Sequence, residues 1–215
     1  LEYAVGDNPL GPFKFSGVIM DESPTGCWTN HHSILNFKKQ WYLFYHHNDL
    51  SPNFDKNRSI RMDSLSFNAD GTIKKVVPTL RGVGLTAASS KIQIDRYSAI
   101  SAQGVSIGFI DTADRFRGWK ARLNSPGAWL QYNSVDFSGR APRSVEMMAT
   151  SQTGGTLQIR LNSPSGPVLA ELVVPVSTPW KLIAGNLSAV GKGTQHLFLT
   201  QKGGGDVEVD WLRFK

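Results

Sequence analysis

Short runs in which apolar and polar residues alternate recur along most of the chain, and the clearest of them closes it at residues 206–214 (DVEVDWLRF). Successive side chains of a β-strand point to opposite faces of the sheet. The closing run therefore predicts a strand with an apolar face of Val207, Val209 and Trp211 and an acidic face of Asp206, Glu208 and Asp210. Such a strand can end a β-sandwich, hold a cation, or do both.

The first part of the chain contains a series of predicted strands separated by turn residues. A short strand is expected at 13–20, and four consecutive strands are expected at 33–37, 41–46, 59–67 and 72–77. Lys38-Lys39-Gln40 and 68–71 (NADG) supply the turns between neighbours. Four antiparallel strands of this size are typical of one blade of a β-propeller, whose faces need neighbouring structure.

The second part has the same alternation with Gly, Ser and Pro turns at short spacing. Strands are predicted at 92–97, 128–135, 144–150, 157–162, 168–174, 180–185, 195–201 and 207–214. This pattern is typical of a β-sandwich or jelly roll. We therefore predict an all-β protein: a propeller-type blade at 1–87, a linker at 88–90 and a jelly-roll β-sandwich at 91–215.

Composition narrows the possible partners. The net charge of +6 is uneven, with nine Lys/Arg and eight Asp/Glu in residues 1–87 but fourteen and nine in residues 88–215. The basic residues of the second part are scattered singly, and no compact basic run with interleaved aromatics marks a nucleic-acid site, so we expect no nucleic-acid partner. No apolar run is long enough to span a membrane, and we expect no membrane partner. One cysteine excludes an intrachain disulfide, and a first residue other than methionine is expected for a piece of a longer protein.

The first part resembles the last blade of glycoside hydrolase family 43. The resemblance rests on 30–34 (NHHSI), 41–46 (WYLFYH), 58–60 (RSI) and 67–73 (FNADGTI). It implies a five-bladed propeller of the β-xylosidase or arabinofuranosidase type, in which His32 or His31 lies on the propeller axis and Trp28 near the mouth of the site.

The catalytic carboxylates of that family come from earlier blades, and none of the acidic residues of the first part matches them. An inverting glycosidase needs its acid and base on either side of a sugar-sized cleft, which one blade cannot build. We therefore expect no catalytic residue in this chain, although its parent would be a glycosidase.

The second part resembles carbohydrate-binding module family 6 over nearly its whole length. The matching motifs, in order, are 92–97 (IQIDRY), 127–132 (GAWLQY), 154–161 (GGTLQIRL), 164–169 (PSGPVL), 174–180 (VPVSTPW), 193–199 (GTQHLFL) and 209–211 (VDW). The resemblance implies a non-catalytic jelly roll that binds xylan and related β-glycans and is often fused to a family 43 enzyme.

A sugar site needs an exposed aromatic plane for the C–H face of the ring and short polar side chains for its hydroxyls. Trp180 follows Ser-Thr-Pro at a strand corner and matches the stacking tryptophan of the resembling modules. Arg122 stands where those modules have a second aromatic. Either Trp119 replaces that ring, or Arg122 donates hydrogen bonds instead, or the cleft no longer binds sugar. Glu208 or Asp206 stands near the usual cleft asparagine.

A calcium site is expected at the first and last strands of the sandwich. Calcium prefers carboxylate, amide and backbone carbonyl oxygens. Gln93 and Asp95 share a face by their i, i+2 spacing, and the resemblance places Asp210 beside them, with carbonyls of the 111–116 loop completing the structural site.

The sequence thus predicts a monomeric binder of xylan or arabinoxylan that targets an attached glycosidase, and the family resemblance implies that it is secreted. The first alternative is a fragment of an inverting arabinofuranosidase or β-xylosidase. The second is a lectin-like adhesion domain whose ligand is another polysaccharide.

Overall fold

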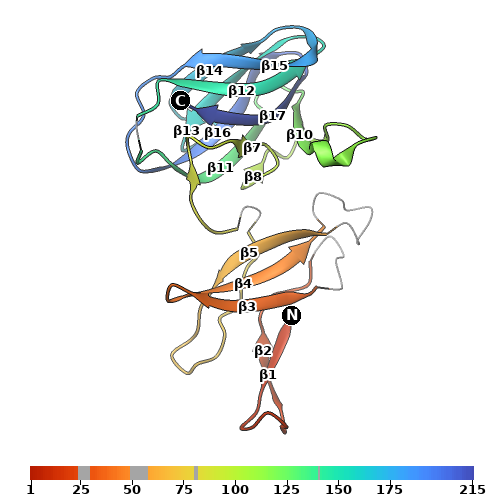
Figure 1. Cartoon of the computed structure of the whole chain (residues 1–215), viewed down its shortest axis with the longest axis vertical. Helices are drawn as coiled ribbons and strands as arrows, with labels where there is room; N and C mark the ends of the chain where they lie inside the picture. Colours follow the sequence, from red (N-terminus) through yellow and green to blue (C-terminus); the bar gives the residue numbers. More distant parts are fainter. Residues whose placement is uncertain (24–29, 49–57, 80–81, 140) are drawn as a thin grey trace. The chain divides into compact units, whose positions relative to one another are not determined.

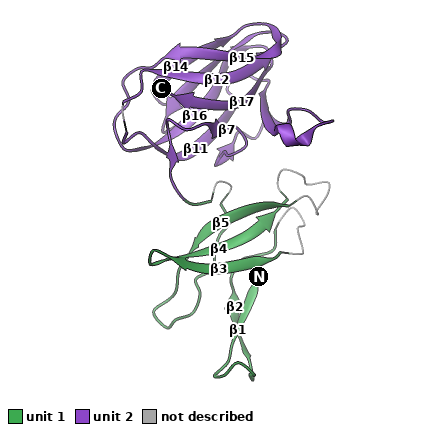
Figure 2. Cartoon of the chain, viewed as in Figure 1, with its two compact units in different colours: residues 1–83 green, residues 84–215 purple. Residues whose placement is uncertain are grey.

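The computed structural model describes residues 1–23, 30–48, 58–79, 82–139 and 141–215. The chain divides into two compact units, Leu1–Val83 and Gly84–Lys215 (Figure 2). Both are built from strands (Figure 1), and the one helical turn among the described residues is a 3₁₀ turn at Arg115–Arg117. The all-β prediction is confirmed. No helix of the described part is long and apolar enough to cross a membrane.

The first unit contains a hairpin and a three-stranded sheet. The hairpin pairs β1 (Glu2–Val5) with β2 (Lys14–Val18), and the sheet has the order β3 (His32–Phe37), β4 (Gln40–His47), β5 (Ser59–Leu65). Lys38 and Lys39 form the two-residue turn between β3 and β4, both with positive φ, as a primed hairpin turn requires. The core of this unit consists of Ile19, Met20, Leu43, Tyr45, Leu65 and Val76.

The fourth strand predicted for the blade, at 72–77, does not form as a regular strand. Among the described residues it is reduced to an isolated bridge between Phe67 and Ile73. The bridge has the two hydrogen bonds of an antiparallel pair, from Asn68 N–H to the carbonyl of Thr72 and from Lys74 N–H to that of Ser66. The next one leaves the ladder, because Val76 N–H donates to the carbonyl of Ile19. The segment therefore joins the sheet to the N-terminal hairpin instead of extending the sheet.

The second unit is a sandwich of two six-stranded sheets. Sheet I has the order β15 (Ser177–Asn186), β12 (Ser144–Ser151), β17 (Val207–Phe214), β10 (Trp119–Leu123), β9 (Val105–Phe109), with β7 (Ile92–Gln93) paired to β17. Sheet II has the order β14 (Val168–Val174), β13 (Gly155–Leu161), β16 (Thr194–Gly204), β11 (Trp129–Asp136), β6 (Thr86–Ala87), with β8 (Ala99–Ile100) paired to β11. This confirms the predicted sandwich.

The core between the sheets comes from the alternate positions that the sequence pattern marked as apolar. Sheet I contributes Ala121, Leu123, Val145, Met147, Ala149, Val207 and Val209, and sheet II contributes Leu130, Tyr132, Leu157, Ile159, Leu197 and Leu199; all of them are buried. The opposite face of sheet I, which carries Met148 and Thr150, is called its outer face below.

The domain boundary differs slightly from the predicted one, since it falls between residues 83 and 84 instead of after 87. Residues predicted as linker belong to the sandwich: Ala88 N–H donates to the carbonyl of Asp136, and Phe214 N–H donates to that of Ala88. Backbone pairing of β6 with β11 fixes this segment although its side chains are small and polar.

The closing strand β17 does not alternate strictly, so the prediction that Trp211 shares a face with Val207 and Val209 is wrong. Val209 pairs with Ala149 but Trp211 pairs with Met148, and the register shifts between these two pairs. Directly opposed residues of an antiparallel pair share a face, so this β-bulge turns Trp211 to the outer face. There its ring is covered by the ammonium of Lys91, 4.4 Å from the ring centroid, and it remains buried.

Candidate functional site

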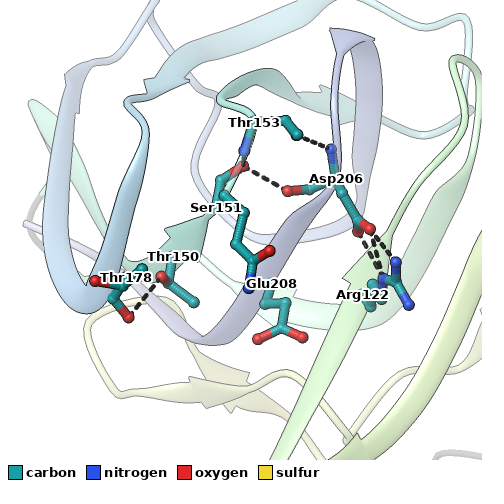
Figure 3. Close-up of a pocket in the computed structure, with 8 residues that line it drawn as sticks. Arg122, Thr150, Ser151, Thr153, Thr178, Asp206 and Glu208 are labelled. Carbon is teal, nitrogen blue, oxygen red and sulfur yellow. Dashed lines mark hydrogen bonds and ion pairs between the residues drawn. The ribbon is translucent and has the colours of Figure 1, made fainter.

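A pocket of about 340 Å³ lies at one end of the outer face of sheet I (Figure 3). Every described residue that lines it is polar: Arg122, Thr150, Ser151, Gln152, Thr153, Thr178, Asp206 and Glu208. They come from β10, β12, β15 and β17 and from the turns that join these strands to others. The pocket therefore offers carboxylates, a guanidinium, an amide and hydroxyls within one hollow.

The strand register places three of these side chains in a row across the sheet. Thr150 pairs directly with Glu208, and Glu208 pairs directly with Arg122. Because opposed residues share a face, all three side chains lie on the outer face at the usual interstrand spacing of about 4.8 Å. Figure 3 shows Glu208 between the Thr150–Thr178 end of the pocket and the Arg122–Asp206 end.

Arg122 is held at its end of the pocket by Asp206. Its Nε donates to both carboxylate oxygens of Asp206 at 2.7 Å, and Nη2 donates to Oδ2 as well. The hydrogen bond and charge of Asp206 raise the pKa of Arg122 above its usual value, so the guanidinium stays charged.

The main chain of Asp206 is fixed in turn by the turn between β12 and β13. Its N–H donates to Thr153 Oγ1 at 2.9 Å, and its carbonyl accepts a hydrogen bond from Ser151 Oγ. Thr153 can approach Asp206 this closely only because the residue before Asp206 is Gly205. A Cβ added at Gly205 would lie 1.8 Å from Thr153 Oγ1. Arg122 is thus oriented through a rigid turn.

Glu208 is held by a second cation of β10. Lys120 Nζ lies 2.8 Å from each of its carboxylate oxygens. Lys120 and Arg122 of β10 therefore face Asp206 and Glu208 of β17, one base for each acid. We call these four residues the charge ladder.

Trp180 lies on β15 near the pocket, although it is not among the residues that line it. It comes two residues after Thr178, which does line the pocket, in the stretch between Ser177 and Lys181 where the register of β15 against β12 shifts. Its side chain is half-buried. The structure therefore brings Arg122 and Glu208 into one pocket and places Trp180 on the neighbouring edge strand.

Trp119 lies away from the pocket. It is three residues from Arg122 on β10, an odd separation, so it shares the opposite face with buried Ala121. There it stacks on Phe109, with ring centroids 4.1 Å apart. Of the two alternatives for the missing aromatic ring, the geometry leaves Arg122 and removes Trp119.

Sequence reasoning missed the hydroxyl groups of the pocket and the role of Lys120. The sequence feature that could have indicated them is 150–153 (TSQT), a run of four polar residues at the end of an alternating strand. Its significance depends on β12 lying next to β17, which the local pattern does not show.

The proposed metal ligands lie near the junction of β7 with β17. The predicted strand at 92–97 ends at Gln93, and a turn follows in which Arg96 N–H donates to the carbonyl of Gln93, so the expectation that Gln93 and Asp95 share a strand face is wrong. Gln93 pairs with Trp211, and Ile94 N–H donates to the carbonyl of Asp210. Burial raises the pKa of Asp95, and burial together with the negative charge of Asp95 raises the pKa of Asp210 against the opposing effect of Lys91. Two carboxylates thus share a partly desolvated site.

No cluster of three or more His, Cys, Asp or Glu side chains that could hold a metal occurs in the described ranges. The expected third side-chain ligand, Gln93, would contribute an amide oxygen and is not one of those four residue types. The oxygen donors Gln93, Asp95 and Asp210 suit a hard cation such as calcium. The 111–116 loop was expected to complete the site with its backbone carbonyls. In this loop the carboxylate of Asp111 accepts from Ala113 N–H and pairs with Arg117.

The two candidate axis histidines, His31 and His32, lie at the start of β3, and both are exposed. His32 pairs with Tyr45 and so shares its face. His31 donates its N–H to Nδ1 of His46, with the two rings edge to face. Trp28 lies outside the described residues.

Three comparisons with known proteins agree on the second unit. The family described as carbohydrate binding module (family 6) matches residues 96–215. An arabinoxylan arabinofuranohydrolase of Paenibacillus polymyxa is 26% identical over 223 residues, which cover 95% of this chain and 34% of the relative. A beta-xylosidase of Xylanibacter ruminicola is 49% identical over 76 residues, which cover 34% of this chain and 23% of the relative. The chain spans about a third of the length of the first relative and less of the second.

Solved structures show the same fold. A glycoside hydrolase family 43 arabinoxylan arabinofuranohydrolase from Bacillus subtilis, in complex with cellotetraose, covers all of this chain with 47% of its own length, at a TM-score of 0.66 and 23% identity. The module CsCBM6-3 from Clostridium stercorarium, in complex with cellobiose, covers 61% of this chain with 97% of its own, at a TM-score of 0.55 and 26% identity.

Proposed function

Because this chain belongs, through residues 96–215, to carbohydrate binding module family 6, we propose that it binds cell-wall β-glycans, xylan or arabinoxylan above all, at the pocket of sheet I. In this role the module holds an attached glycosidase on its polymeric substrate. The xylan preference is supported by the names of the relatives, an arabinoxylan arabinofuranohydrolase and a beta-xylosidase.

The observation that carries this proposal is the polar pocket with a half-buried tryptophan two residues from Thr178, one of its lining residues. A pyranose presents hydroxyls around its rim, and the pocket presents acceptors and donors for them in Glu208, Arg122 and the threonines. Trp180 supplies the flat apolar surface on which the C–H face of a neighbouring sugar stacks. A polysaccharide can use both at once because it extends over several sugars.

Replacing Trp180 with alanine is expected to weaken binding to xylan strongly. Loss of the stacking surface should cost about 2 kcal/mol, or roughly a 30-fold fall in affinity. Affinity electrophoresis in gels containing xylan, laminarin or mannan measures the effect. Wild-type protein should be retarded most in xylan, and Trp180→Ala should migrate nearly as it does in a gel without polysaccharide.

Phe116→Ala is the matched control, because Phe116 is a fully exposed aromatic of the same unit in the loop before β10. It should be retarded like the wild type. Equal retardation of Trp180→Ala and wild type would move the binding surface elsewhere. Retardation in laminarin or mannan but not in xylan would favour the lectin-like alternative.

We also propose that Gln93, Asp95 and Asp210 hold a structural calcium ion. The donors fit this ion: they are oxygens, and the two carboxylates are close enough for the charge of one to raise the pKa of the other. A divalent cation would neutralise that repulsion and stabilise the junction of β7 with β17.

The alternative function, a fragment of an arabinofuranosidase or β-xylosidase, is favoured only by the relatives' names. The buried carboxylate of the first unit, Asp63, is used structurally, since it accepts hydrogen bonds from Tyr45 Oη and from Thr79 N–H and Oγ1. We expect no release of arabinose or xylose from arabinoxylan by this chain alone. Turnover by the purified chain would overturn the binder-only proposal.

We propose further that the protein is secreted and monomeric, as a module that acts on insoluble polysaccharide outside the cell. Light scattering of the purified protein, with and without xylan oligosaccharides, tests whether it is monomeric.

A further inference from the structure

We propose that Glu208 is the specificity-determining residue of the pocket, an acceptor for two neighbouring hydroxyls of an uncharged glycan, and that Lys120 is the residue that positions it. This inference rests on the proposed glycan-binding function and adds the chemical class that the pocket selects. It follows from the charge ladder.

Glu208 has the central position in the pocket. Its neighbours in the register are Thr150 on one side and Arg122 on the other, and Figure 3 shows its carboxylate between the two ends. Its side chain is 27% exposed, so a ligand can reach it.

Lys120 leaves part of that carboxylate available. A carboxylate has about four lone-pair sites on its two oxygens. Lys120 contacts both oxygens at 2.8 Å but is not among the residues that line the pocket, so it binds from beside the hollow. Each oxygen therefore keeps acceptor capacity toward the pocket, while the ammonium holds the group in one orientation.

The complementary ligand is a pair of adjacent hydroxyls. Each can donate to one oxygen, and hydrogen bonds to an ionised acceptor are shorter and stronger than those to a neutral one. A glycan that carries carboxylates near this point would meet Glu208 as a like charge. Arg122 offsets little of that repulsion, because its charge is balanced by Asp206, which accepts from its Nε and Nη2. Lys120 lies beside the hollow and not among the residues that line it. The pocket thus selects neutral sugars partly by excluding acidic ones.

The experiment is titration calorimetry with two ligands, neutral xylohexaose and a xylo-oligosaccharide bearing one glucuronic acid branch. Wild type should prefer the neutral ligand. Glu208→Gln keeps the shape but removes the charge, and it should bind xylohexaose roughly tenfold more weakly or worse. The same variant should narrow the difference between the two ligands.

Lys120→Met tests the positioning role through a double-mutant cycle with Glu208→Gln. If Lys120 acts only through Glu208, the double variant should bind xylohexaose as weakly as Glu208→Gln alone. Additive losses would mean that Lys120 contacts the sugar itself and would overturn the positioning role. Melting curves of each variant separate weakened binding from lost folding.

Glu171→Gln and Lys202→Met form the matched control pair, because Lys202 lies 2.9 Å from Glu171 on sheet II. Neither should change affinity. If wild type binds xylohexaose and Glu208→Gln binds it equally well, the inference fails and the proposed function stands. If wild type binds neither oligosaccharide nor any polysaccharide gel, the proposed function itself fails.

Discussion

Removal of calcium is expected to lower the melting temperature of the second unit by roughly 10 °C. A ligand that binds only the folded state stabilises it by about 2.7 kcal/mol at a concentration 100 times its Kd, which corresponds to a shift of this size for a domain of such length. The physical reason is that Asp95 and Asp210 are left partly desolvated beside each other when no cation neutralises them. Scanning calorimetry with calcium and with a chelator measures the shift.

The calcium effect should depend on pH in a defined direction. The pKa values of Asp95 and Asp210 are raised in the folded, metal-free protein. A raised folded pKa contributes stability that is present below the unfolded pKa and is lost as the pH rises through the folded one. The metal-free protein therefore loses this contribution above the carboxyl range, where both groups ionise and calcium binds best. The shift should be large at pH 7 and small at pH 4.

Asp95→Asn and Asp210→Asn should each reduce the calcium-dependent shift at pH 7, whereas Glu171→Gln, an exposed carboxylate on β14, should leave it intact. A wild-type melting temperature that is the same in calcium and in chelator would remove the proposed metal site. The glycan-binding proposal would not depend on that result.

Asp63→Ala is expected to cost the first unit about 3 kcal/mol of unfolding free energy. Asp63 is buried and accepts hydrogen bonds from Tyr45 Oη at 2.5 Å, Thr79 N–H at 3.1 Å and Thr79 Oγ1 at 2.5 Å. Alanine would leave these donors without their acceptor, and the buried ones cannot turn to water. Burial, followed by the hydrogen bond and charge of Asp63, raises the pKa of Tyr45, so the phenol remains a donor.

Asp21→Ala is the control for that substitution. Asp21 pairs with Lys75 at 2.6 Å, but both side chains are more than half exposed, so the pair should contribute well under about 1 kcal/mol. Urea unfolding followed by hydrogen exchange of β4 and β5 reports on the first unit separately. Equal stability of Asp63→Ala and Asp21→Ala would show that the hydrogen bonds of Asp63 with Tyr45 and Thr79 do not stabilise the first unit.

Most strands of the sandwich could be predicted because alternation is a local property. The predicted bounds of β14 and β17 match the observed ones, and those of β11 and β12 differ by one residue. β9 and β10 were missed. In β10 the residues that face outward are Lys120 and Arg122, and a small Ala121 lies between them, so after Trp119 the segment has no β-branched or aromatic residue to mark a strand.

The candidate site was predicted only in part. Arg122 and Glu208 were identified by resemblance and do meet in one pocket. Trp119 was one of two alternatives for the missing ring, and it points to the other face because three residues along a strand reverse the side. The ion pairs of the charge ladder could not be read from the sequence, because Lys120 and Glu208 are 88 residues apart and Arg122 and Asp206 are 84 apart.

The closing strand shows which features the sequence alone determines and which depend on the tertiary structure. By itself the sequence determined that 207–214 is a strand, that Val207 and Val209 face the core, and that acidic residues face away from them. Only the tertiary structure decided that a bulge turns Trp211 outward. It also decided that Lys120 and Arg122 of β10 pair with Glu208 and Asp206, and that Thr150 lies beside Glu208 on the same face. The period of a strand is set by its own backbone, whereas its partners and its register are set by packing against segments far away in the chain.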